Sequence, residues 1–193
     1  MDNTVGSLNW QQKSVILGCV LGDGHLRKLE GRKNAFLEVN HSAKAKEYVE
    51  WKYKILKDIC KSAPKERKID KKRKALRFFT REHPEITEIY EKFYKDGKKI
   101  VPKGFRLNPL ILAVWFMDDG SKTKKGDIYL NTQKFDWKSQ RRLLHALRMI
   151  GIKARMNKDK KYWRIRIYKD SLLKLVKLIS PYIVESMRYK LPV

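Results

Sequence analysis

The sequence predicts an α+β fold made of two similar units, each with the element order αββαββα and an antiparallel sheet. The prediction starts from an apolar helical stretch that ends in Asp-Gly and occurs twice, at Ile16–Gly24 and at Leu112–Gly120. After each stretch, the alternation of apolar and polar residues typical of strands is followed by apolar residues at helical spacing. The second half of the chain therefore repeats the plan of the first.

The lengths of the two halves set the expected boundary between the units. From the first motif aspartate to Pro102 is 79 residues, and from the second to Pro192 is 73 residues. We place residues 1–104 in an N-terminal unit and residues 105–193 in a C-terminal unit, with Leu107–Pro109 as a short linker. The units are expected to be related by a pseudo-twofold axis along the two apolar helices.

The first apolar helix carries a start signal and a flat face. Ser7 or Asn9 suits its N-cap, and the helix runs through Leu21. Gly18 and Gly22 lie four residues apart, so a second helix can approach this face closely. We expect the two apolar helices to pack against each other at the interface between the units.

The second apolar helix ends in two acids and a glycine. Gly120 suits a left-handed cap position. Asp118 and Asp119, however, occupy the negative end of the helix dipole, where basic residues are normally favoured. Acids at this position indicate a bound cation.

In the N-terminal unit, the elements follow from alternation, helical spacing and turn residues. In chain order they are a hairpin of Leu26–Lys28 and Ala35–Ser42 around the turn Glu30–Asn34, a helix over Ala43–Ser62 closed by Pro64, a strand within Ile69–Lys72 paired with Ala75–Thr80, and a helix over Pro84–Tyr94.

The C-terminal unit is predicted in the same way, and Gly151 is expected to stop its middle helix. In chain order its elements are a turn at Ser121–Asp127, a strand over Ile128–Gln133, a helix over Trp137–Ile150, a hairpin of Lys153–Asn157 and Tyr162–Tyr168 around Lys158–Lys161, and a helix over Leu172–Ile179.

The charge of the chain points to a polyanionic partner. The 193 residues include 46 Lys and Arg against 21 Asp and Glu, a formal net charge of +25. The excess is spread over both halves, with 25 basic and 14 acidic residues up to Gly104 and 21 basic and 7 acidic residues after it. Nucleic acid is the leading candidate. No run approaches the roughly 20 apolar residues that a membrane-spanning helix needs, so no membrane partner is expected.

The two Asp-Gly stretches resemble a known signature. Aligned on the final Asp-Gly, both match the nine-residue motif of the LAGLIDADG homing endonucleases, and Trp115–Gly120 is similar to the subgroup typified by the mitochondrial omega-intron endonuclease. The resemblance spans nearly the whole chain. It implies a monomer in which the two sheets form a DNA-binding saddle, with the motif helices at the interface.

The motif acids are the expected catalytic and metal-binding groups. Asp23 and Asp119 end equivalent helices, so they would lie side by side where those helices cross. An isolated Asp-Gly is usually a turn, but two equivalent copies favour a shared site for Mg²⁺, which takes oxygen ligands and bridges to phosphates. Mn²⁺ and Ca²⁺ suit the same ligands. The main chain at the equivalent positions Gly22 and Asp118 is expected to contribute to the metal site.

The resemblance also implies one basic residue from each half near the scissile phosphate. The matching positions are Lys99 and Lys190, which would order water or stabilise charge.

Strands with one apolar and one polar face are expected to carry the contacts with DNA. Such a sheet packs on helices behind and lies against a groove in front, where Arg can bond guanine and Asn or Gln can bond adenine. The candidates are Arg32, Lys33, Glu38, Asn40 and Arg77 in the N-terminal unit and Lys122, Asn131, Gln133, Arg155, Asn157, Arg164 and Arg166 in the C-terminal unit.

The leading hypothesis is a monomeric, Mg²⁺-dependent DNA endonuclease that makes a double-strand break at a long asymmetric site. Two alternatives on the same scaffold stay open: an RNA maturase that assists intron splicing, with intron RNA as partner, and a catalytically silent DNA-binding protein. The presence of both motif acids argues against the silent version.

Overall fold

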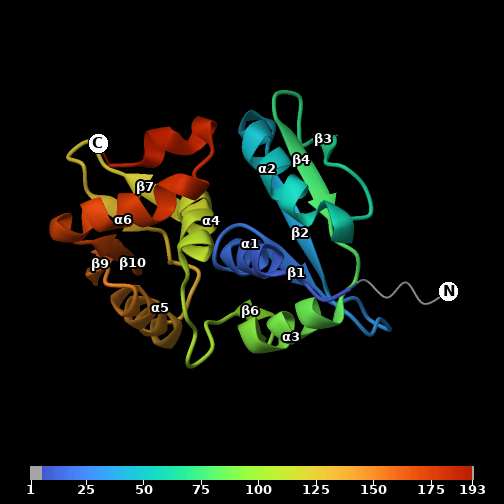
Figure 1. The fold of residues 1–193 in the computed structure, drawn as a ribbon, viewed down its shortest axis with the longest axis horizontal. Helices are drawn as coiled ribbons and strands as arrows, with labels where there is room; N and C mark the ends of the chain where they lie inside the picture. The colour runs from blue at the N-terminus through green and yellow to red at the C-terminus, as the bar shows by residue number, and fades with distance from the viewer. Residues whose placement is uncertain (1–5, 193) are drawn as a thin grey trace. The chain divides into compact units, whose positions relative to one another are not determined.

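The computed structural model describes residues 6–192, which form two units with the same order of main elements (Figure 1). The units comprise Met1–Glu91 and Lys92–Val193. The order αββαββα occurs in both and each has a four-stranded antiparallel sheet, so the predicted fold class is confirmed.

The first unit begins with its motif helix, and its sheet has the strand order β1-β2-β4-β3. Its elements are α1 (Trp10–Leu21), β1 (His25–Arg27), β2 (Phe36–Ser42), a 3₁₀ turn (Ala43–Ala45), α2 (Lys46–Leu56), a second 3₁₀ turn (Lys57–Ile59), β3 (Lys65–Lys68), β4 (Lys74–Phe79) and α3 (Pro84–Phe93). The final residues of α3, Lys92 and Phe93, belong to the second unit.

The second unit has a sheet with the equivalent order β7-β8-β10-β9. Its elements are the short pair β5 (Tyr94–Lys95) and β6 (Lys98–Lys99), then α4 (Pro109–Asp119), β7 (Gly120–Lys122), β8 (Ile128–Leu130), α5 (Trp137–Met149), β9 (Ala154–Asp159), β10 (Tyr162–Ile167) and α6 (Leu172–Ile179), with 3₁₀ turns at Lys169–Ser171, Ser180–Tyr182 and Glu185–Lys190.

The segment between α3 and α4 packs with the second unit. The Ile100 N–H donates to the Phe93 carbonyl at 2.7 Å, and the Val101 N–H donates to the Ser139 hydroxyl at 2.9 Å. The sequence-based boundary between residues 104 and 105 stays a prediction.

In the first unit, one face of the sheet packs on α2. Leu37, Val39 and Phe78 point to this side and are buried. The Tyr53 ring of α2 meets the Phe78 ring edge-on at 5.7 Å between centroids. Residues that alternate with these, such as Asn40, point to the opposite face, which is called here the polar face.

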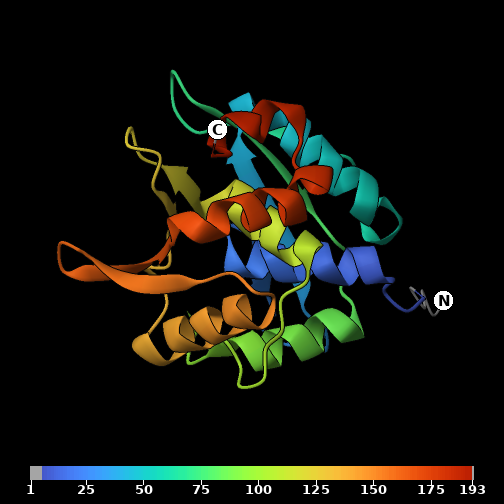
Figure 2. The ribbon, with the colours of Figure 1, turned by 60° about the vertical axis from the view of Figure 1, so that its left-hand side comes forward.

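The second unit is layered in the same way. Ile165 and Ile167 of β10 are buried on the side covered by α5. Trp163 lies on the same side, where its ring centroid is 5.5 Å from that of Trp137 of α5. Figure 1 agrees, since α5 lies beside β9 and β10. In Figure 2, the β9–β10 hairpin extends beyond the helices of its unit.

Local chemistry explains the helix boundaries. Asn9, not Ser7, caps α1: its side chain accepts from the Gln12 N–H at 2.9 Å, and the Gln12 side chain accepts from the Asn9 N–H. Gly151 follows α5 with φ +75°, as expected for a left-handed stop.

One strand of the first unit was predicted at the wrong residues. The strand that pairs with β4 is Lys65–Lys68, not a segment within Ile69–Lys72. Ile69–Lys72 forms the turn instead, because the Asp70 carboxylate accepts from the main-chain N–H groups of Lys72 and Arg73 at 2.9 Å each.

Several predicted elements differ in extent from those observed. The helix predicted over Ala43–Ser62 is α-helical over Lys46–Leu56 alone, with 3₁₀ turns at both ends. The strand predicted over Ile128–Gln133 ends at Leu130, and Ser121 belongs to strand β7 rather than to a turn. Within residues 6–192, no helix has the length and apolar character needed to cross a membrane.

Candidate functional site

The end of α1 presents Asp23 to solvent. The Gly22 N–H continues the helix by donating to the Gly18 carbonyl at 2.9 Å, but the Gly24 N–H reaches five residues back to the Cys19 carbonyl at 2.8 Å. Asp23 lies in this widened turn and is exposed. It lies just before β1, the edge strand of the first sheet.

The end of α4 has a different geometry. The Gly120 N–H donates to the Phe116 carbonyl, four residues back, so Asp118 and Asp119 both remain helical. Both are partly exposed. The prediction that Gly120 is left-handed is wrong, since its φ is −73°. Glycine is required there for space, because a Cβ would clash with the carbonyl oxygen and ring of Phe116.

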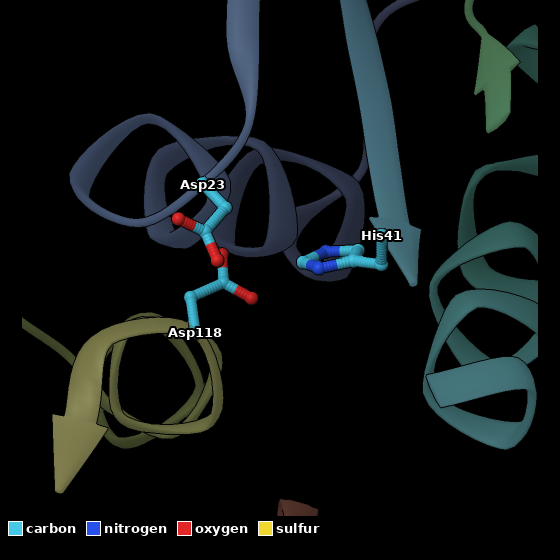
Figure 3. Close-up of side chains that lie close together, drawn as sticks. All are labelled: Asp23, His41 and Asp118. Atoms are coloured by element: carbon cyan, nitrogen blue, oxygen red, sulfur yellow. The ribbon is translucent and has the colours of Figure 1, made fainter. Parts of the chain in front are cut away.

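Asp119 is already engaged within its unit. Its Oδ2 lies 2.9 Å from the Nζ of Lys134, and its main-chain carbonyl accepts from the Asn131 N–H at 2.9 Å. The side chain of Asp118, labelled in Figure 3, lies one residue earlier in the same last turn.

Lys190 lies at the carbonyl end of α4. Its Nζ donates to the carbonyl of Met117 and, at 3.3 Å, to the carbonyl of Asp118. A cation at the C-terminal end of a helix interacts favourably with the helix dipole and offsets the two acids. The predicted Lys190 is thus brought to the motif helix of its unit. Lys99 lies on β6, opposite Tyr94, and is partly buried.

A histidine near Asp23 was missed by the sequence-based prediction. His41 lies on β2, and a ring nitrogen of His41 and a carboxylate oxygen of Asp23 lie within 4.8 Å of each other (Figure 3). On its other side, the Nε2 of His41 is 2.9 Å from the Nζ of Lys52. An ammonium donor at Nε2 would place the imidazole hydrogen on Nδ1.

Lys52 is a fully buried lysine, which is rare without a partner. His41 is one partner of its ammonium group, and the Tyr48 ring, whose centre is 4.1 Å away, is another. The signal in the sequence was the helical spacing of Tyr48, Lys52 and Leu56, which places the lysine on the apolar face of α2.

Four of the predicted DNA-contacting residues share the polar face of the second sheet. Arg164 lies opposite Asn157, and Arg166 lies opposite Arg155. Directly opposed residues of antiparallel strands point to the same side, and alternate residues along a strand do so as well. The structure therefore brings all four together.

Two carboxylates and a tyrosine orient the arginines on this face. The guanidinium of Arg164 lies 3.9 Å from the centre of the Tyr129 ring. Arg166 donates to Asp127 at 2.6 Å, and this bond raises the pKa of the arginine. Asp159 lies 3.7 Å from Arg164.

The other predicted residues of this unit are placed less uniformly. Gln133 donates to Asp159 at 3.3 Å, which brings it to the arginines. Asn131 approaches Ser121 on β7 at 3.5 Å. Lys122 is paired with buried Ile128, so it points to the opposite side of the sheet, and its amine donates to the Leu191 carbonyl at 2.8 Å.

In the first unit, the polar face holds Asn40, Arg77 and Glu38. Asn40 lies opposite Arg77. Glu38 is only 8% exposed and is held between Arg27 at 2.6 Å and Arg77 at 3.6 Å. Arg32 and Lys33 lie apart from these residues, exposed in the turn between β1 and β2.

The two cysteines lie in the interior of the protein. Cys19 and Cys60 are buried thiols. Burial raises the pKa of the Cys60 thiol to about 12, so it is not a nucleophile at neutral pH.

A family model described as the LAGLIDADG DNA endonuclease family matches residues 13–175, which include both stretches that end in Asp-Gly and both four-stranded sheets. The chain belongs to this family. The structure resembles that of the homing endonuclease I-WcaI bound to its DNA recognition sequence, with a TM-score of 0.85, 28% identity, and coverage of 96% of this chain and 88% of that chain.

Two curated relatives of this LAGLIDADG chain carry different names. The cytochrome b mRNA maturase bI2 of Saccharomyces cerevisiae is 32% identical over 99% of this chain and 49% of the relative, so the chain spans about half the length of that protein. The protein named "Probable intron-encoded endonuclease 1" of Wickerhamomyces canadensis is 30% identical over 93% of this chain and 83% of the relative.

Proposed function

We propose that the chain is a monomeric, site-specific DNA endonuclease that uses a divalent metal ion to hydrolyse both strands of a long asymmetric site. One observation carries the proposal. In each unit, a motif helix ends in an acid and leads into the edge strand of a sheet whose polar face holds arginine and amide side chains. A DNA duplex bound to such a face would run close to the acid at the end of the motif helix.

The acids at the two helix ends are the proposed metal ligands. The exposed Asp23 and the acids of α4 are oxygen donors, the ligand type that Mg²⁺, Mn²⁺ and Ca²⁺ take. We propose Asp23 and Asp119 as the principal ligands, with Gly22 and Asp118 beside them. A metal bound here would neutralise charge at the scissile phosphate and activate water. Lys134 is paired with the Oδ2 of Asp119 and would compete with a metal ion for that oxygen.

Lys190 and Lys99 are proposed to stabilise negative charge near the scissile phosphate. Support for Lys190 comes from its position at the end of α4, where its ammonium accompanies the acids. A cation at this place favours the charge that develops as the phosphodiester is attacked. Lys99 rests on the family resemblance.

The test is cleavage and binding of a selected DNA site by acid-to-amide variants. Asp23→Asn and Asp119→Asn are expected to lose cleavage and to bind DNA nearly as the unchanged protein does, because binding rests on many phosphate and base contacts. Asp118→Asn tests whether the neighbouring acid also holds metal. Asp58→Asn, an exposed acid in a 3₁₀ turn, is the matched control.

Each outcome has a defined meaning. Full cleavage by Asp23→Asn would remove the metal assignment. Loss of cleavage with Asp118→Asn but not with Asp119→Asn would move the second ligand to Asp118. An unchanged protein that binds a specific site but does not cleave it with Mg²⁺, Mn²⁺ or Ca²⁺ would instead be a silent DNA-binding protein.

A second candidate function is assistance of intron splicing as an RNA maturase. The identity of 32% over 99% of this chain with a cytochrome b mRNA maturase favours it. The measurement is the splicing rate of a cytochrome b precursor RNA with and without the protein. Stimulation that persists in Asp23→Asn would support a separate RNA function, and unchanged splicing would remove this candidate.

A further inference from the structure

The second unit carries a basic pocket away from its polar sheet face. Four side chains of α5 line it, and the loop that leads to α4 completes it. The lining residues used here are Lys103, Phe105, Lys138, Arg141, Arg142 and His145. Of the residues that the structure describes, none with a carboxylate lines this pocket.

The positions along α5 place the pocket on the outer side of the helix. Residues 138, 141, 142 and 145 follow the i, i+3, i+4, i+7 spacing of one helix face. The opposite face, with Leu143 and Leu147, is buried against the sheet. Trp137 of α5 contacts Trp163 on the apolar side of β10, so the polar face with Arg164 and Arg166 lies on the far side of that sheet.

Two basic surfaces of one unit are therefore separated by a helix layer and a sheet. An α-helix with its side chains is about 10 Å across, and packed layers lie roughly 10 Å apart. A straight duplex lying on the polar face cannot also reach the pocket behind α5. The cations of the pocket are thus not accounted for by DNA bound to the sheet.

The pocket combines exposed cations, one fixed cation and an aromatic ring. Lys103, Lys138 and Arg141 are exposed. Arg142 is held by a hydrogen bond to the Val101 carbonyl at 2.5 Å. The ring of Phe105 is half-buried and packs edge-on against the Phe93 ring, with 5.5 Å between the ring centroids.

We propose that this pocket binds single-stranded RNA, with the exposed cations on its phosphates and the Phe105 ring against a base. Single-stranded RNA is recognised by bases on aromatic rings together with basic side chains on the backbone, whereas a rigid duplex cannot place a base in such a hollow. The inference rests on the second candidate function and is independent of the proposed DNA cleavage.

The test is RNA binding by the double variant Lys138→Gln/Arg141→Gln, with a fluorescein-labelled single-stranded RNA of random sequence as probe. Lys174→Gln/Lys177→Gln on α6 is the control, because it removes the same charge from another exposed helix of the same unit. The pocket variant is expected to lose RNA affinity about ten-fold. Its negative slope of log affinity against log salt should become shallower by roughly 1.4, the value for two lost phosphate contacts. The control should change little.

DNA cleavage and thermal unfolding distinguish a local loss of RNA binding from damage to the whole protein. Both double variants are expected to cleave the selected DNA site and to unfold at nearly the temperature of the unchanged protein. Equal loss of RNA affinity in the pocket variant and the control would overturn the proposal. So would parallel loss of DNA binding, or complete displacement of the RNA by the selected duplex, since each would mean that one surface serves both ligands. Should the double variant unfold, Arg141→Gln alone gives the same readouts.

Discussion

Arg164 and Arg166 are neighbours on one strand face, but their surroundings hold them differently. Arg164 lies over the Tyr129 ring, whereas Arg166 is bonded to Asp127. A side chain held before binding loses less rotamer freedom when it reaches a base. We therefore expect both arginines to act as sequence readers rather than as general phosphate contacts.

Replacing Arg164 should relax sequence preference at one position of the DNA site. A bidentate arginine contact contributes about 1–3 kcal/mol of discrimination against the wrong base. Arg164→Ala should therefore accept other bases at that position while cleaving its best site. The measurement is selection of cleaved sites from a randomised duplex library. Lys158→Ala is the control, since Lys158 lies opposite Trp163 and points to the other side of the sheet. An unchanged preference profile would remove Arg164 from the readers.

At the scale of elements, the two motif helices end differently although both stretches finish in Asp-Gly. The last bond of the first stretch spans five residues, from Gly24 to Cys19, and that of the second spans four, from Gly120 to Phe116. Both glycines serve close packing, because a Cβ at Gly24 would lie 2.6 Å from the Cβ of Cys19.

Gly120→Ala should destabilise the protein without touching an ionisable group. The added methyl meets the carbonyl and ring of Phe116, and such overpacking costs about 1–3 kcal/mol. The measurement is the free energy of unfolding from denaturant titration. Gly6→Ala is the control, because a Cβ there meets nothing within 4 Å. Equal stability of the two variants would contradict the close contact.

For the whole molecule, charge dominates the expected binding behaviour. The excess of Lys and Arg over Asp and Glu is present in both halves of the sequence and gives a net charge of +25. Each phosphate that the protein neutralises releases condensed counterions, so binding must weaken as salt rises.

Affinity for the selected DNA site should fall steeply with salt. The expected slope of log affinity against log salt is about −0.9 for each phosphate contact. Titrations of labelled duplex at several salt concentrations measure it, and Arg166→Ala should change sequence preference more than slope. An affinity that does not depend on salt would contradict DNA binding to the polar faces of the sheets.

Much of the fold was predictable because its signals are local. Asn9 with Gln12 forms a capping box from neighbouring residues, and the alternation in Tyr162–Ile167 is itself the pattern of a half-buried strand. The duplicated Asp-Gly stretches likewise identified both motif helices and, by resemblance, the family. The candidate acids and arginines were selected by residue type and position within these patterns.

What the sequence alone determined is the order of the elements and the residues that lie near their ends and faces. Tertiary structure decided which of those residues meet. It made Lys65–Lys68 the partner of β4 through the turn at Asp70, placed buried Lys52 against His41, and paired the charges of Lys134 and Asp119. The reason is physical: local patterns depend on neighbours in the chain, whereas ion pairs, buried polar contacts and strand register depend on residues that only folding brings together.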